Sequence, residues 1–197
     1  MTLNKWFPAL AAALALSICT MPASAQEKLS RSKLINSLQG FDKTAAKINP
    51  AGLDLVIREY IQNNPSDVTA SRAPFPVQLG SLRQFDVEVQ FDFDKDVIRP
   101  ASYRTVGTVA DALHHPVMLG SRFLIVGHTD AKGDRKYNME LSKKRAESVR
   151  TALIEAFNID PKRLFAVGFG EEQLLDTKKP NSGSNRRVQL INIGLFK

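Results

Sequence analysis

The chain has 197 residues, enough for one main domain with its own hydrophobic core, and a formal net charge of +7 from 27 Lys and Arg against 20 Asp and Glu. This basic balance suits an anionic polymer or a membrane surface as a partner. With a single cysteine, Cys19, the chain cannot close an internal disulfide, so a disulfide-stabilised scaffold is excluded.

Residues 1–25 have the features of a signal peptide. Lys5 is the only charge among them, residues 9–18 are almost wholly apolar, and Ala23-Ser24-Ala25 forms an A-x-A cleavage site. The apolar stretch is shorter than the about 20 residues that a transmembrane helix needs. We therefore expect an exported, soluble protein that starts at Gln26, and export makes nucleic acid an unsuitable partner.

The alternative for this segment is a lipid anchor on Cys19. Cleavage after Ala25 removes this cysteine, whereas cleavage before it would leave an outer-membrane lipoprotein. Ile18 stands where a lipoprotein signal has a small residue, which favours the first of the two.

Residues 26–64 are predicted to form a short helical region. Two apolar stripes at helical spacing support this prediction. The first consists of Leu34, Ile35, Leu38 and Phe41. The second follows the helix-start signal Asn49-Pro50 and consists of Leu53, Val56, Ile57, Tyr60 and Ile61. Helices this short are marginal alone, so we expect them to pack on the main domain or on a partner, without a separate function. Residues 65–80 contain several prolines and are predicted to be a linker, which leaves residues 81–197 as the main domain.

The main domain opens with a strict alternation of apolar and polar residues. This pattern predicts a strand over residues 85–93 with one covered face, which is formed by Phe85, Val87, Val89, Phe91 and Phe93. A helix then starts at Arg99-Pro100 and ends at His114-His115-Pro116. Its apolar stripe is predicted to consist of Tyr103, Val106, Val109 or Ala110, and Leu113.

A strand over residues 122–130 and a helix over about residues 138–157 form the centre of the domain. The strand begins with a continuous apolar run, which is typical of burial on both faces, and ends in Gly127-His128-Thr129-Asp130. A carboxylate thus stands where the strand leaves the sheet, at the edge where ligands bind in open α/β sheets. Along the helix, residues at every fourth position form an apolar stripe of Leu141, Val149, Leu153 and Phe157. Arg145 occupies the position between Leu141 and Val149 in this series. Such an arginine extends to the rim, pairs with a structural acid or faces a ligand.

The last part of the chain is predicted to contain two more strands. These are Arg163–Gly168 and Val188–Ile193, with a polar loop from Glu171 to Asn185 between them. The order is then β-α-β-α-β-β, preceded by the helical N-terminal region. The fold class is α/β (α+β) with a mixed sheet.

Six motifs in this order resemble the peptidoglycan-binding domain of the outer-membrane protein A (OmpA-like) family. The resemblance covers roughly residues 85–194, more than half of the chain. The motifs are Phe91-Asp92-Phe93-Asp94, Gly127-His128-Thr129-Asp130, Tyr137-Asn138 with Leu141-Ser142, Arg145-Ala146, Gly168-Phe169-Gly170-Glu171, and Asn185-Arg186-Arg187-Val188. The fold of this family has the same order of elements.

Asp130 and Arg145 are suited to bind an amino-acid zwitterion. They are fifteen positions apart, at a strand end and about two turns into the next helix, so both side chains can face one crevice. Asp130 would take the ammonium group, and the guanidinium fork of Arg145 would take the carboxylate. Backbone N–H groups near Asn138, at the start of the helix, would favour the same anion.

The resemblance implies what the ligand is. The family binds the diaminopimelate residue of peptidoglycan stem peptides, and the positions matching Asp130 and Arg145 make these contacts. Further family positions that line the pocket are Phe93, Asp94, Thr129, Asn138 and Leu141, and Arg186 follows the family's Asn-Arg-Arg. The protein is thus expected to bind peptidoglycan without catalysis in the periplasm, associated with the outer membrane. An outer-membrane protein partner and a homodimer are both left open.

Other chemistries have weaker support in the sequence. The adjacent His114 and His115 lack the spacing of a helical zinc pair, so we expect neither a metal nor a cofactor. The alternation places His128 and Asp130 on one side, which leaves a peptidoglycan-modifying enzyme as the alternative function. No second catalytic group accompanies them, and a carboxylate beside an arginine is a weak base.

Overall fold

The computed structural model describes residues 29–40, 48–64, 79–92 and 94–195. The predicted signal peptide 1–25 with Cys19, Phe41, most of the predicted linker 65–80 and Phe93 lie outside the described residues. The division into a helical region, a linker and a main domain stays a prediction. None of the helices that the structure describes is long and apolar enough to span a membrane.

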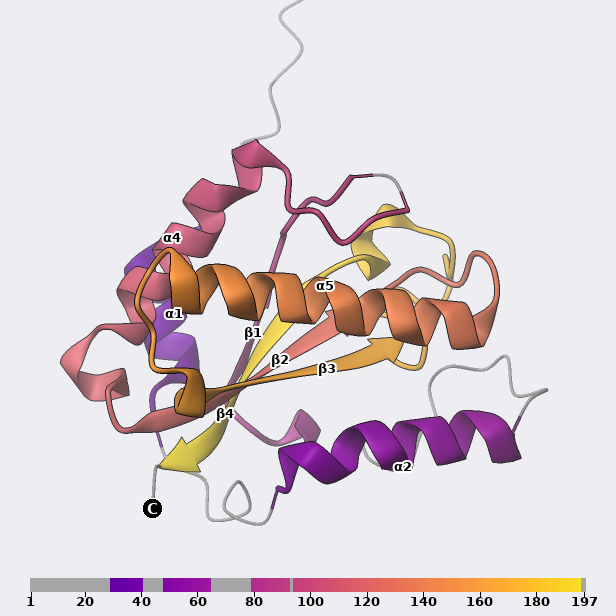
Figure 1. Ribbon diagram of the computed structural model, residues 1–197, viewed down its shortest axis with the longest axis horizontal. Helices are drawn as coiled ribbons and strands as arrows, with labels where there is room; N and C mark the ends of the chain where they lie inside the picture. The colour runs from indigo at the N-terminus through magenta and orange to yellow at the C-terminus, as the bar shows by residue number, and fades with distance from the viewer. Residues whose placement is uncertain (1–28, 41–47, 65–78, 93, 196–197) are drawn as a thin grey trace, which may run out of the picture.

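Four strands form one mixed sheet with the order β1-β4-β2-β3. They are β1 (Gln84–Val87), β2 (Ser121–His128), β3 (Leu164–Gly170) and β4 (Val188–Leu195). The central β2 runs parallel to β3 and antiparallel to β4, which also pairs antiparallel with β1. This confirms the predicted mixed sheet and the β-α-β-α-β-β order (Figure 1).

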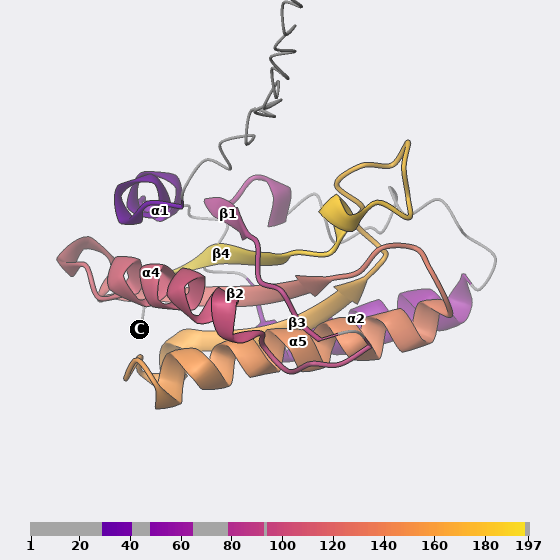
Figure 2. The ribbon, with the colours of Figure 1, turned by 90° about the horizontal axis from the view of Figure 1, so that it is seen from above.

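Helices cover both faces of the sheet. On one face lie α4 (Tyr103–Leu113) and α5 (Arg135–Glu155), packed on Phe123 and Ile125 of β2. The alternate β2 residues Leu124 and Val126 point to the other face, where α2 (Pro50–Asn63) packs. All four of these β2 side chains are completely buried, as expected for a central strand. Figure 2 shows α5 running along β3.

The predicted strand 85–93 is only half as long in the structure. β1 ends at Val87, which faces Val188, the first residue of β4. Beyond this pair no strand lies opposite, so the backbone bonds to its own continuation: the Asp92 N–H donates to the Val97 carbonyl at 3.1 Å and the Arg99 N–H to the Gln90 carbonyl at 2.9 Å. Residues 88–92 therefore form an irregular loop over the end of the sheet, and the prediction was wrong there.

The apolar stripes of the two main helices differ from the predicted ones at single positions. In α4, Val106, Val109, Ala110 and Leu113 are buried as predicted, but Tyr103 is exposed in the first turn. The buried face of α5 runs through Met139, Ser142, Ala146, Val149 and Leu153. Steps of four residues drift by about 40° per step around a helix with 3.6 residues per turn. Leu141 and Arg145 therefore lie on the flank of this face and are half-buried.

Both N-terminal helices pack on the sheet, as one of the sequence-based alternatives predicts. Leu34 and Leu38 of α1 (Arg31–Leu38) are completely buried in the same core cluster as α4, and the Asn192 side chain of β4 donates to the Leu38 carbonyl at 2.9 Å. In α2, which begins with the predicted Asn49 cap, Ile57 and Ile61 are buried. Val56 is exposed, against the prediction.

Candidate functional site

Two glycines allow α5 to lie directly on the strands that carry the site. Gly127 of β2 and Gly168 of β3 are paired neighbours in the sheet. A Cβ atom on Gly127 would lie 2.0 Å from the Ser142 carbonyl oxygen of α5, and one on Gly168 would lie 2.5 Å from the Met139 carbonyl oxygen. The Ser142 hydroxyl accepts a hydrogen bond from the Gly170 N–H at 2.8 Å, which fastens the helix to β3. This contact sets the position of the loop that joins β2 to α5.

Asn138, in the first turn of α5, holds this loop in shape. It is buried, and its amide nitrogen lies 2.9 Å from the Lys132 carbonyl, 3.3 Å from the Asp130 carbonyl and 2.6 Å from Glu171 Oε2. Asp134 caps the helix, since its Oδ1 accepts the Tyr137 N–H at 2.8 Å. α5 thus begins three residues before the predicted position, and Asn138 supports the loop rather than the start of the helix.

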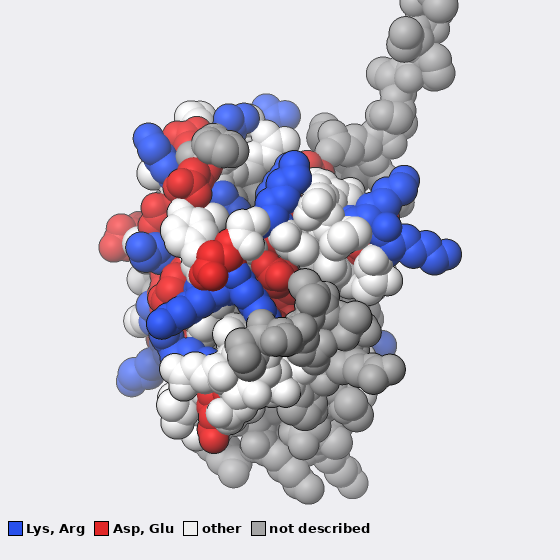
Figure 3. Space-filling view, turned by 90° about the vertical axis from the view of Figure 1, so that its right-hand side faces the viewer, with Lys and Arg blue, Asp and Glu red and all other residues white. Residues whose placement is uncertain are grey.

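The loop borders a groove of about 830 Å³ between the start of α5 and residues 88–99. Every predicted site residue that the structure describes lines this groove: Asp94, Thr129, Asp130, Asn138, Leu141, Arg145 and Arg186. Phe93 lies outside the described residues. The segments that carry these residues are far apart in the sequence and converge at one end of the sheet, the end that faces the viewer in Figure 3.

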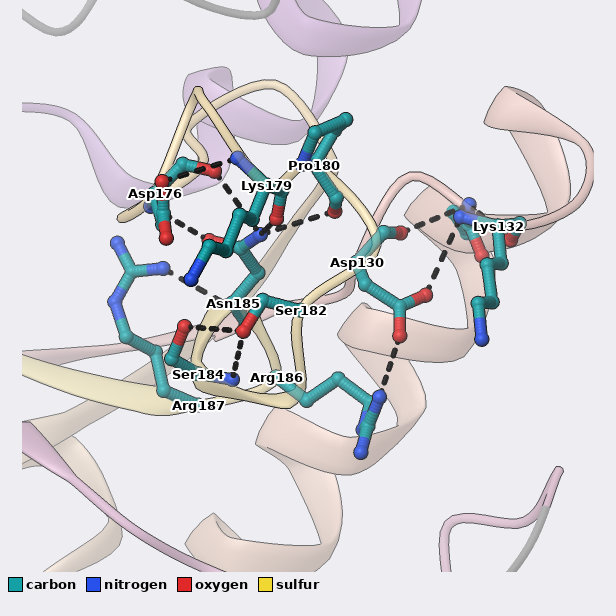
Figure 4. Close-up of polar contacts among 11 residues, drawn as sticks. Asp130, Lys132, Asp176, Lys179, Pro180, Ser182, Ser184, Asn185, Arg186 and Arg187 are labelled. Atoms are coloured by element: carbon teal, nitrogen blue, oxygen red, sulfur yellow. Dashed lines mark hydrogen bonds and ion pairs between the residues drawn. The ribbon is translucent and has the colours of Figure 1, made fainter.

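Asp130 is buried at the base of the groove and has two partners. Its Oδ1 accepts the Lys132 N–H at 3.3 Å, and its Oδ2 lies 2.5 Å from Nη1 of Arg186. Figure 4 shows the Arg186 side chain extended toward this carboxylate. The next residue, Arg187, points elsewhere and bonds to the Gln173 carbonyl and to Asp86, so it braces the edge of the sheet. Of the two adjacent arginines, only Arg186 belongs to the groove.

Arg145 faces the groove without a structural acid. Its Nε donates to the Lys95 carbonyl at 3.0 Å, and its guanidinium carbon lies 5.1 Å from the centre of the Phe91 ring. Within the part of the chain that the structure describes, it forms no ion pair. Burial lowers the pKa of Arg145 and the nearby charge of Arg186 lowers it further, whereas the charges of Asp94 and Asp130 oppose this shift. An arginine nevertheless stays protonated, so a ligand carboxylate here would meet a cation that has no carboxylate partner.

Tyr137 is a groove residue that the sequence-based list of sites leaves out. Its hydroxyl donates to Asp94 Oδ1 at 2.7 Å, and this hydrogen bond raises the pKa of Tyr137. Asp94 has a backbone φ of +56°, a left-handed conformation that aspartate adopts more readily than most residues. Tyr137 lies in the Tyr137-Asn138 motif, which was the available signal for it.

His128 does not reach the groove, which removes the basis for the enzyme alternative. It is buried beside Phe169, with 5.8 Å between the ring centres. Burial holds the pKa of His128 well below its usual value, and the charge of Arg187 is the second cause of this shift. Neither the groove nor its rim therefore pairs a histidine with Asp130. Among the described residues, no three His, Cys, Asp or Glu side chains are grouped to hold a metal ion.

Comparisons with known proteins match the same part of the chain. The family model described as the OmpA family matches residues 90–187. Outer membrane porin F of Pseudomonas fluorescens is 36% identical over 107 residues, which are 53% of this chain and 32% of the porin. The peptidoglycan-associated lipoprotein of Pseudomonas aeruginosa is 32% identical over 102 residues, which are 51% of this chain and 58% of the lipoprotein. The chain thus spans about a third and about three fifths of these relatives.

One solved structure is also similar to this chain. The peptidoglycan-associated lipoprotein from Burkholderia pseudomallei is 30% identical, with a TM-score of 0.45, over 60% of this chain and 97% of that one.

Proposed function

The chain belongs to the OmpA family through residues 90–187, and from this premise we propose that it binds peptidoglycan in the periplasm and links the cell envelope to the cell wall. The name of one relative supports this proposal, since it is a peptidoglycan-associated lipoprotein. The porin F relative supports a place at the outer membrane. The proposed activity is binding without catalysis.

The observation that carries the proposal is the balance of charge in the groove. Four carboxylates line it, from Glu88, Asp92, Asp94 and Asp130. Four basic side chains face them, from Arg99, Lys132, Arg145 and Arg186. Acidic and basic side chains are likewise interspersed around this end of the molecule in Figure 3. A groove of this kind favours a ligand that carries both charges over a simple anion.

The specific ligand that we propose is the diaminopimelate residue of a stem peptide. Its side chain ends in an ammonium and a carboxylate on one carbon atom, so both charges enter the groove together. Asp130 is the acid for the ammonium, and Arg145 is the cation for the carboxylate, which its planar fork can bind through two parallel hydrogen bonds. Asp94, Thr129, Leu141 and Asn138 contribute to the surrounding surface.

Incubation with purified sacculi tests this function. We expect the full chain to sediment with sacculi that contain diaminopimelate and to release no soluble fragments from them. Release of soluble muropeptides would show an enzyme instead, and a protein that stays in the supernatant while folded would contradict peptidoglycan binding.

A further inference from the structure

Without a ligand, the carboxylate of Asp130 is already occupied. Arg186 Nη1 lies 2.5 Å from Oδ2, and the Lys132 N–H takes Oδ1. An ammonium group that comes to Asp130 must therefore take the place of the arginine. The cost of binding at this position depends on what happens to Arg186 once it is displaced.

The two members of this ion pair differ in freedom. The Asp130 side chain is 10% exposed, whereas the Arg186 side chain is 51% exposed. Asp130 is further held by the hydrogen bond from the Lys132 backbone N–H, while the Arg186 side chain forms no hydrogen bond or ion pair with any described residue other than Asp130. Because a half-exposed ion pair is only weakly stabilising, Arg186 is the partner that moves.

Arg186 and Arg145 line the same groove. The two guanidinium groups already repel each other, as the effect of Arg186 on Arg145 shows. An ammonium-only ligand would free Arg186 and leave these two cations beside each other with no additional anion. A ligand that brings a carboxylate with its ammonium supplies that anion. Its ammonium group then pairs with Asp130, and its carboxylate is available to the two arginines.

We propose that Arg186 is a specificity-determining residue, which competes with ligand ammonium groups for Asp130 and thereby excludes ligands that lack an adjacent carboxylate. This inference rests on the proposed binding of diaminopimelate. It gives Arg186 a role beyond that of a wall of the groove: a lysine side chain is rejected because it displaces Arg186 without offering it a new partner.

The test compares two matched stem peptides that differ only in carrying diaminopimelate or lysine. Isothermal titration calorimetry measures the affinity of each for the wild-type chain and for Arg186→Gln. We expect the variant to bind the lysine peptide more tightly than wild type does and the diaminopimelate peptide less tightly. The preference for diaminopimelate should fall by about tenfold or more, which corresponds to the loss of one charge-assisted contact. An unchanged preference would overturn the inference.

Two further variants keep the result interpretable. A Cβ atom on Gly183 would lie 2.9 Å from Arg186 Nη2, so Gly183→Ala must shift the guanidinium while keeping its charge. We expect it to lower the preference in the same direction, and an unchanged preference would count against the inference. Arg104→Gln removes the same charge from the exposed part of α4, outside the groove, and should leave the preference as in wild type.

The two proposals fail differently. If the folded wild-type chain binds neither peptide, the proposed function is wrong and this inference falls with it. If wild type prefers diaminopimelate and Arg186→Gln keeps that preference in full, only the role of Arg186 is wrong. Circular dichroism on each variant establishes that the fold is retained.

Discussion

Glu171 and Glu172, directly after the end of β3, are both buried. Glu171 Oε2 accepts a hydrogen bond from Asn138 at 2.6 Å, so it supports the residue that shapes the Asp130 loop. Burial raises the pKa of Glu171, the Asn138 hydrogen bond opposes this, and the charge of Glu172 adds to it. Ionising Glu171 therefore costs more in the folded chain than in the unfolded chain.

We predict that Glu171→Gln stabilises the fold at neutral pH. The pKa of Glu171 is higher in the folded chain than in the unfolded chain. The protonated Glu171 therefore contributes stability at a pH below its unfolded-state pKa, and this contribution is lost as the pH rises through its folded-state pKa. The variant cannot ionise and keeps an oxygen that accepts from Asn138, so its free energy of unfolding at pH 7 should exceed that of wild type. The difference should shrink toward pH 4 in urea denaturation. A less stable variant at pH 7 would mean that the charged hydrogen bond outweighs burial.

Gly127 tests the contact between α5 and the sheet. Because the Cβ atom of Gly127→Ala would overlap a backbone oxygen of α5, the helix must move, and we expect a loss of at least about 3 kcal/mol in the free energy of unfolding. Gly80→Ala is the matched control, since a Cβ there meets nothing within 4 Å, and it should change stability by less than about 0.5 kcal/mol. Equal stability of the two variants in urea would contradict this close approach.

At the scale of elements, α1 is part of the core rather than a separate extension. Its residues Leu34 and Leu38 are completely buried in the core cluster that also contains residues of α4 and β2. The sequence-based division places α1 in a region apart from the main domain 81–197. The packing instead indicates that removal of α1 would expose the apolar surface beneath it and lower the stability of the domain.

A single substitution measures this contribution. Leu38→Ala should lower the free energy of unfolding by about 2–5 kcal/mol, the usual cost of a cavity in a packed core. Val56→Ala, on the exposed side of α2, should cost less than about 0.5 kcal/mol. If chemical denaturation gives similar values for both, α1 does not belong to the core.

The sequence predicts the types and order of the main elements because their patterns are local. The apolar run of β2 and the stripe of α4 depend only on neighbouring residues; the first prediction is confirmed, and the second is confirmed except at Tyr103. The end of β1 is different, since the alternation continues through Val89 and Phe91 but the pairing requires β4, which begins only at Val188. The face of α5 was misplaced because a four-residue step is not the helical period.

At the scale of the whole molecule, the site joins segments that sequence spacing alone does not bring together. The path from β2 to α5 makes the approach of Asp130 and Arg145 predictable, because one loop joins their elements. The contact of Arg186 with Asp130, 56 residues away, depends on β4 lying beside β2, and the contact of Tyr137 with Asp94 depends on the loop that replaces the end of β1. The family resemblance alone indicated that Asp94 and Arg186 share a pocket with Asp130, and it did not place Tyr137 there.

The central claim is that Asp130 and Arg145 bind the two charges of one zwitterion. Isothermal titration calorimetry with a diaminopimelate stem peptide tests it on wild type, Asp130→Ala and Arg145→Ala, with circular dichroism as the check on folding. Each variant leaves one ligand charge desolvated and unpaired, at a cost of about 2–5 kcal/mol, so we predict a loss of about thirtyfold or more in affinity for each. Folded variants that bind the peptide as tightly as wild type would contradict the claim.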